Sequence, residues 1–273
     1  MATSDEHAPV GLSEYVDGLQ ATGRYTFSTE DARTALPISE IALDSALRRL
    51  RQRGRVVSPR RGFHVIVPQE YALAGSPPPP WFIDELMAYL GQPYYVGLLS
   101  AAALHGASHQ QPMVFQVLTD RPTREAAAGR SRIEFHMSGS LVDTPAVRVQ
   151  TETGSMLVST PEATAFDLVR HPEACGGWSA VATVLGELAE RLDPSALALL
   201  AQGRKTPEIQ RLGYLLDRVG EARRADPLLR VLGSRRYRRV RLASDEVVAE
   251  EQAAYRPEGP WRVIANVDVE VDE

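Results

Sequence analysis

Residues 38–67 read ISEIALDSALRRLRQRGRVVSPRRGFHVIV, and this stretch predicts a helix followed by a two-stranded hairpin. From Ser39 to Arg53, apolar side chains recur at the spacing of one helix face, at Leu43, Ala46, Leu47 and Leu50. Gly54 stands where a helix commonly ends in a residue of positive φ. Two short β-prone runs then flank the turn at 59–62. Helix, turn and hairpin together predict a winged helix.

The residues upstream support this prediction. A short helix is expected at 12–19, and a second one opens at Ser28, which Asp31 follows in the pattern of a capping box. Pro37 ends that second helix, and the helix from Ser39 begins soon afterwards. This is the order of a helix-turn-helix, in which the second helix enters the major groove of DNA.

The same stretch is strongly basic. Between positions 48 and 61 there is no acidic residue, and the basic residues are Arg48, Arg49, Arg51, Arg53, Arg55, Arg60 and Arg61. Guanidinium forks match phosphate oxygens and the O6/N7 edge of guanine. The alternative is an ordinary solvated helix face, but the run coincides with a predicted recognition helix and wing.

We therefore predict that the solvent face of the helix contacts base edges, with Ile41 or Ala42 near thymine methyl groups. The end of the helix and the wing would hold phosphates or the adjacent minor groove. The predicted DNA-binding residues are Ser39, Ala42, Ser45, Arg48, Arg49, Gln52, Arg53, Arg60 and Arg61.

Several motifs resemble one family along nearly the whole chain. The N-terminal winged helix of AbiEi-type antitoxins is similar to the motifs at 25–28, 35–37, 47–50, 54–57 and 61–66. The C-terminal domain of the same family is similar to the motifs at 95–107, 160–168, 211–216 and 261–266. Each motif is mostly apolar packing and a helix start, so it is their order along the chain that carries the resemblance.

The resemblance implies a function and partners. AbiEi-type proteins repress their own operon by binding inverted repeats upstream of it. They also neutralise the nucleotidyltransferase toxin of a type IV toxin-antitoxin pair, commonly without a stable complex. The implied partners are therefore double-stranded operator DNA and a cognate toxin, with no cofactor. Two copies could occupy an inverted repeat even if the free protein is a monomer.

Composition sets outer limits on these expectations. The chain has 273 residues, 44% of them hydrophobic, which is enough for two modest domains. The net charge of −5 argues against indiscriminate coating of nucleic acid, so the basic charge is local. Cys175 is the only cysteine, which excludes an intramolecular disulfide and favours a reducing cytoplasm. No apolar run reaches the length of a membrane span.

The order of the predicted elements favours an α+β fold. We expect a winged helix-turn-helix domain at 1–73, a linker at 74–80 and a larger mixed α+β domain at 81–273. The linker is placed at the four prolines 77–80, which favour an extended polyproline spacer. Within the second domain, residues 124–129 are expected to form an exposed loop and residues 237–242 a strand.

A second basic run lies near the end of the chain. It comprises Arg235, Arg236, Tyr237, Arg238, Arg239 and Arg241. If this run is extended, alternate side chains share a face, and an aromatic ring among arginines can follow a nucleic-acid backbone. A charged edge strand that discourages aggregation fits the pattern equally well.

Two alternative functions remain open from the residues alone. One is a metal-dependent nuclease that uses Asp120, Glu134 and Asp143, and the other is a regulator that senses a small ligand. Other catalytic signals are weak. His105 and His109 lack the glutamate of a zinc-protease helix, Cys175 has no evident base, and no glycine-rich phosphate loop is present. We therefore do not expect an enzyme.

Overall fold

The computed structural model describes residues 11–107, 113–243 and 259–270. The chain divides into two compact units. The first holds the described residues up to Tyr95 together with Met113–Leu141 and Arg148–Leu157, and the second holds the remainder. The mixture of helices and sheets confirms the α+β class.

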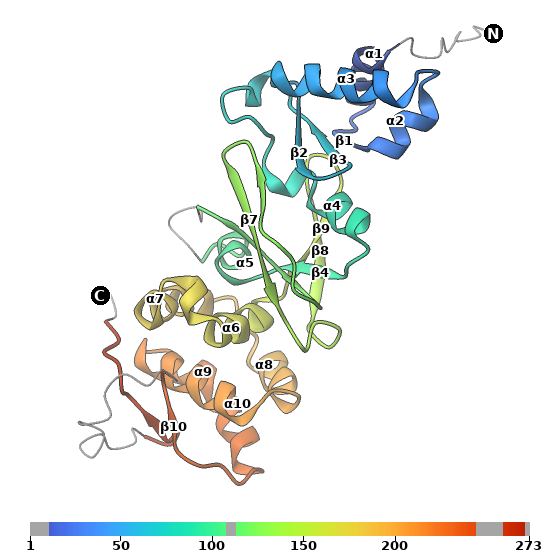
Figure 1. The fold of residues 1–273 in the computed structure, drawn as a ribbon. Coiled ribbons are helices and arrows are strands. Elements are labelled where there is room, and N and C mark those ends of the chain that lie inside the picture. The colour runs from blue at the N-terminus through green and yellow to red at the C-terminus, as the bar shows by residue number, and fades with distance from the viewer. Residues whose placement is uncertain (1–10, 108–112, 244–258, 271–273) are drawn as a thin grey trace, which may run out of the picture. The chain divides into compact units, whose positions relative to one another are not determined.

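The first unit begins with three helices and a three-stranded sheet (Figure 1). Its elements are α1 (Leu12–Ala21), β1 (Thr26–Ser28), α2 (Thr29–Ala35), α3 (Glu40–Gln52), β2 (Val56–Arg60) and β3 (Phe63–Ile66). The strands are ordered β1-β3-β2, and both neighbours of β3 are antiparallel to it. This is the arrangement of helices and hairpin that the stretch 38–67 predicts.

Local chemistry explains where these helices begin and end. Ser28 and Asp31 form a complete capping box at the start of α2, as the sequence predicts. The hydroxyl of Ser39 accepts from the backbone N–H of Ala42 and caps α3. Gly54 adopts a φ of 66° just beyond the C-cap Arg53, a conformation that costs a glycine little.

The proline-rich segment does not coincide with the division between the two units. The first unit continues past residues 74–80 as far as Tyr95. Within the segment, Ser76 and Pro77 are buried, and Pro79–Trp81 form a single 3-10 turn. The segment is therefore packed against its neighbours.

A six-stranded sheet follows, with the order β6-β7-β5-β4-β9-β8. Its elements, with the helix that precedes them, are α4 (Ile83–Leu90), β4 (Tyr94–Val96), β5 (Phe115–Thr119), β6 (Ala126–Ala128), β7 (Ser131–Met137), β8 (Ala146–Gln150) and β9 (Ser155–Ser159). Strand β7 is parallel to β5 and antiparallel to β6. The expectation of a loop at 124–129 is wrong, because three alanines give no alternating pattern by which a strand could be recognised.

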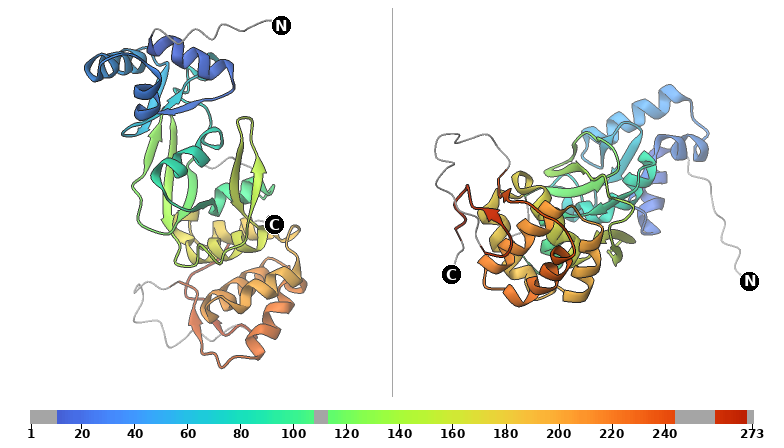
Figure 2. Two further views of the ribbon diagram at one scale, coloured as in Figure 1. Left: turned by 90° about the vertical axis from the view of Figure 1, so that its right-hand side faces the viewer. Right: turned by 90° about the horizontal axis from the view of Figure 1, so that it is seen from below.

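The second unit is largely helical, and Figure 2 shows its C-terminal helices gathered in one bundle. Its helices are α5 (Leu98–Leu104), α6 (Pro161–Arg170), α7 (Trp178–Ala189), α8 (Pro194–Gln202), α9 (Thr206–Arg218) and α10 (Ala222–Gly233). A short parallel pair, β10 (Val240–Arg241) and β11 (Val263–Ile264), completes it. The strand expected at 237–242 is therefore confined to two residues.

Helix α6 is the centre of this bundle and contacts α5, α7, α8 and α9. Every residue from Glu162 to Val169 is buried. Its buried charges have partners: the Glu162 carboxylate accepts from the backbone N–H of Asp193 at 2.9 Å, and Asp167 lies 3.7 Å from the Arg170 guanidinium. A buried charge without such partners destabilises the fold, so these contacts fix the position and the rotation of α6 within the bundle.

Gly213 on α9 allows the ring of Trp261 to pack directly against that helix. A Cβ atom added at Gly213 would lie 2.0 Å from Trp261 Cζ3. We expect Gly213→Ala to lower the free energy of unfolding by about 1–3 kcal/mol, as overpacked cores do. The matched control is Gly18→Ala in α1, where an added Cβ meets nothing within 4 Å. The control should raise stability by roughly 1 kcal/mol in denaturant unfolding, and a loss of the same size in both variants would contradict the packing assignment.

His64 on β3 provides a test by pH. The ring is buried, and its two nitrogens lie 2.9 Å from the Thr29 hydroxyl and 2.8 Å from the Ser58 hydroxyl. Burial, assisted by the charge of Arg51, lowers the pKa of His64 to about 4. The unfolded chain takes up this proton near pH 6.5, so folding stability contributed by the neutral ring is complete above that pH and is lost as the pH falls toward 4.

Over this interval His64 should account for about 3 kcal/mol of the decrease in the free energy of unfolding. His64→Gln keeps a polar side chain but binds no proton in this range. Urea unfolding at pH 7 and at pH 4.5 should therefore show a smaller decrease for the variant than for the wild type. Equal decreases would mean that His64 is protonated in the folded protein.

Candidate nucleic-acid interface

The two faces of α3 differ sharply in burial. Leu43, Leu47 and Leu50 are buried in a core formed with α1, α2 and the three-stranded sheet. The opposite side chains are exposed, and they include Asp44, Ser45, Arg48, Arg49 and Gln52. Ile41 is 81% exposed at the start of the helix. The predicted recognition residues on α3 thus share one solvent-facing side.

The arginines of this side differ from other arginines of the same small domain. Arg33 lies 2.7 Å from Glu30 and 3.0 Å from Glu40, and Arg55 lies 2.6 Å from Asp17. Among the described residues, no carboxylate forms a salt bridge with the remaining arginines of α3 and its cap, which are Arg48, Arg49, Arg51 and Arg53. A group of exposed cations without carboxylate partners attracts a polyanion.

Arg60, predicted to contact DNA, is held elsewhere. Its guanidinium donates to the backbone carbonyl of Glu125 at 2.8 Å and to that of Arg124, and lies 5.5 Å from the centre of the Phe135 ring. Burial, followed by the charge of Arg124, lowers the pKa of Arg60. Both terminal nitrogens of Arg60 are therefore engaged within the protein. Arg61 remains exposed on the wing.

The second basic run does not form one extended face. Arg235 donates to the carbonyls of Ala201, Gln202 and Arg204, and so satisfies the end of α8. No local sequence pattern predicts this contact, because it joins segments that are distant along the chain.

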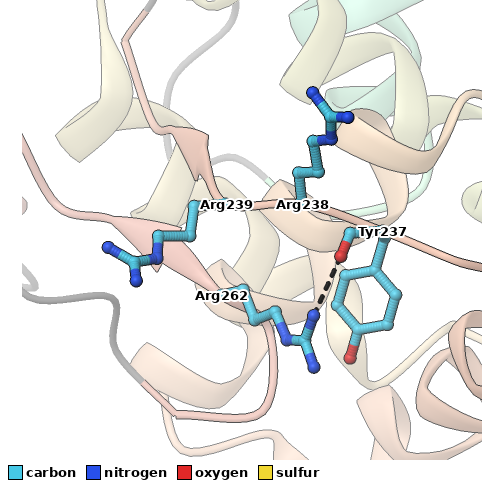
Figure 3. Close-up of a pocket in the computed structure, with 4 residues that line it drawn as sticks. All are labelled: Tyr237, Arg238, Arg239 and Arg262. Carbon is cyan, nitrogen blue, oxygen red and sulfur yellow. Dashed lines mark hydrogen bonds between the residues drawn. The ribbon is translucent and has the colours of Figure 1, made fainter.

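Tyr237, Arg238 and Arg239 of the run line a surface pocket of about 630 Å³ together with Arg262, which sequence reasoning missed (Figure 3). Arg262 donates to the Tyr237 carbonyl at 2.9 Å, and its guanidinium lies 4.6 Å from the centre of the Tyr237 ring. Figure 3 shows the side chains of Arg238 and Arg239 pointing away from each other. The pocket is basic, but one face of its aromatic ring is already covered.

The residues of the alternative functions are not assembled into a site. Within the described ranges, no group of three or more His, Cys, Asp or Glu side chains could hold a metal ion. Glu134 lies 3.7 Å from both Arg132 and His136. His105 Nε2 lies 2.7 Å from the Ser159 carbonyl, and His109 falls outside the described residues. Burial raises the pKa of Cys175 to about 12, which disfavours a thiolate.

One further finding concerns membranes. Of the helices in the described parts of the chain, none combines the length and the apolar composition needed to cross a bilayer.

Comparison with known proteins identifies the central segment. The crystal structure of the RV2827C protein from Mycobacterium tuberculosis is similar over 96% of this chain and 95% of that chain, with a TM-score of 0.66 and 19% sequence identity. At that identity the likeness concerns the fold alone. No curated protein matches the chain. A family model described as "AbiEi antitoxin C-terminal domain" matches residues 95–218, which carry α5–α9 and most of the six-stranded sheet. Residues 95–218 therefore belong to the AbiEi antitoxin C-terminal domain family.

Proposed function

We propose that this chain is a DNA-binding transcriptional repressor and the antitoxin of a type IV toxin-antitoxin pair. The antitoxin domain at 95–218 supports an antitoxin role. The exposed basic side of α3 is the observation that carries the DNA-binding half of the proposal. In this account the protein represses its own operon through inverted repeats and counteracts a nucleotidyltransferase toxin.

The side chains of α3 suit different parts of a DNA site. Ser45, Arg48, Arg49 and Gln52 lie on the exposed side and would face base edges in the major groove. Exposed Ile41 offers an apolar contact for a thymine methyl group, with Ala42 beside it. The Asp44 carboxylate can accept hydrogen bonds but cannot donate them, so it favours a cytosine amino group. Its negative charge disfavours a close approach to phosphate.

The remaining cations would set the position of the helix on the duplex. Arg53 is the C-cap residue of α3, and Arg61 is exposed on the wing. Contacts from these residues to phosphates would add affinity without sequence preference. Ser39 already caps α3 through its hydroxyl, so it would act mainly by orienting the start of the helix.

The pocket lined by Tyr237, Arg238, Arg239 and Arg262 is proposed as a secondary contact for nucleic acid. Its support is the charge of three arginines within a surface hollow. The Tyr237 ring could stack a base on only one of its faces, because Arg262 covers the other.

The partners follow from the same proposal. An inverted repeat presents two equivalent half-sites, so two copies of the chain would bind one operator even if the free protein is a monomer. The toxin would be a functional partner, silenced without a stable complex. The protein would act in the cytoplasm, where its operon and the substrates of its toxin are located.

Arg48→Ala should weaken binding to the operator by about 1–3 kcal/mol if Arg48 forms a bidentate contact with guanine. Binding to scrambled DNA should change much less, so specificity falls with affinity. Fluorescence anisotropy with both DNAs measures this difference. Arg132→Ala is the matched control, since Arg132 is an exposed arginine already paired with Glu125 at 2.7 Å. Equal losses of operator affinity for the two variants would contradict a specific contact by Arg48 and would indicate only a general effect of charge.

The double substitution Arg48→Ala/Arg49→Ala should separate the two proposed activities. Repression of a reporter joined to the upstream DNA should be lost, because the exposed side of α3 no longer carries its two central cations. Growth in the presence of the co-expressed neighbouring nucleotidyltransferase should still be rescued, because the antitoxin domain at 95–218 is unchanged. Loss of rescue by a double variant that remains folded would contradict this division.

A further inference from the structure

The wing, formed by β2, β3 and the turn between them, contacts other parts of the first unit through side chains that a free wing would expose to solvent. Arg60 at the end of β2 reaches the segment just before β6, and its two terminal nitrogens donate to the carbonyls of Arg124 and Glu125. Its guanidinium also lies over the ring of Phe135 on β7. Strands β2 and β6 are in contact along this region. Hydrogen bonds from a charged donor are stronger than those between neutral groups.

The turn of the wing is held by a second contact. The hydroxyl of Tyr89 on α4 donates to the carbonyl of Arg61 at 3.0 Å, and its ring lies 5.4 Å from the centre of the Phe63 ring. Gly62 has a φ of 80°, and a Cβ added there would lie 2.4 Å from the Tyr89 oxygen. The turn therefore presses against α4 at a position where a side chain would have to displace that hydroxyl.

A third contact lies beyond the wing. The backbone N–H of Arg130 donates to the carbonyl of Ala74 at 2.8 Å, and a Cβ added at Gly129 would lie 2.3 Å from the same oxygen. The ring of Trp81 contacts the rings of Tyr25 and Tyr71, at 4.9 Å and 5.2 Å between centres. All of these residues belong to the first unit.

We infer that the wing is an internal bracket, by which we mean that the contacts of Arg60 and Tyr89 hold the winged helix against β6 and α4. Helix α3 is then presented to DNA without insertion of the wing into the minor groove. This inference rests on the proposed DNA binding. Arg60 and Tyr89 are positioning residues, since neither touches DNA in this account. Figure 1 shows β2 and β3 lying between the three N-terminal helices and the strand β7, as this arrangement requires. Arg61 keeps an exposed side chain, which would contact a phosphate.

Neighbouring arginines of the wing supply the test. Arg60→Gln and Arg61→Gln each remove one positive charge. If only Arg61 contacts a phosphate, Arg61→Gln should reduce the salt slope of DNA binding by about 1, whereas Arg60→Gln should leave it unchanged. Arg60→Gln should instead raise hydrogen exchange at the amides of β2 and β3 by roughly tenfold, because two hydrogen bonds that hold the wing are lost.

Two further variants separate the bracket from a charge effect. Arg60→Lys keeps the charge but cannot span both carbonyls, so it should resemble Arg60→Gln in hydrogen exchange. Tyr89→Phe removes only the hydroxyl bound to Arg61, and it should also increase exchange in β2 and β3. The full chain is used throughout, since the winged helix is packed within a larger unit.

The outcomes are distinguishable. A reduced salt slope for Arg60→Gln, with hydrogen exchange as in the wild type, overturns the bracket and makes Arg60 a phosphate contact. Wild-type protein that binds no DNA at any salt concentration contradicts the proposed function. Hydrogen exchange in the free protein still decides in that case whether Arg60 and Tyr89 hold the wing.

Discussion

The candidate interface depends on the burial of one apolar face of α3. Leu43, Leu47 and Leu50 enter a core shared with α1, α2 and the three-stranded sheet. Burying each of these side chains contributes roughly 1.5–3 kcal/mol, so rotating the helix about its axis would be costly. The same constraint fixes Arg48 and Arg49 on the solvent side. An overall net charge of −5 is therefore compatible with a strongly basic local surface.

The second unit is organised by a different constraint, which is the satisfaction of buried polar groups. Helix α6 is surrounded by other helices, and its Glu162 carboxylate accepts from a backbone N–H while Asp167 forms an ion pair with Arg170. Buried Gln210 on α9 donates to the carbonyls of Arg238 and Trp261, at 2.9 Å and 2.7 Å. These bonds fasten the C-terminal segments to the bundle. The second unit thus has a firmly specified core, and the basic pocket lies at its surface.

Sequence patterns predicted the features that depend on neighbouring residues. Helical spacing located α3, the capping box located the start of α2, and Gly54 marked the end of α3, because each signal lies within a few positions of its effect. The class of the fold followed from the order of such elements. Strand β6 escaped prediction because alanines carry no alternation, and its place is fixed by pairing with β7.

The roles of individual arginines were the least predictable part. Arg48 and Arg60 belong to the same basic run of the sequence. Arg48 is exposed on a helix, whereas Arg60 donates to two carbonyls more than sixty positions away. Arg235 likewise serves the end of α8. Such contacts join distant segments, so no local pattern reports them. The family resemblance, in contrast, spread over many short motifs and was confirmed at residues 95–218.

In the proposed function, the basic side of α3 reads a specific DNA site. The most direct test is fluorescence anisotropy of the full-length protein on the DNA upstream of its own gene and on scrambled DNA, across a range of salt concentrations. The upstream DNA should be bound at least about a thousandfold more tightly at physiological salt, and this preference should persist as salt weakens both complexes. Equal affinity for the two DNAs at every salt concentration would contradict it and would reduce α3 to a general phosphate-binding surface.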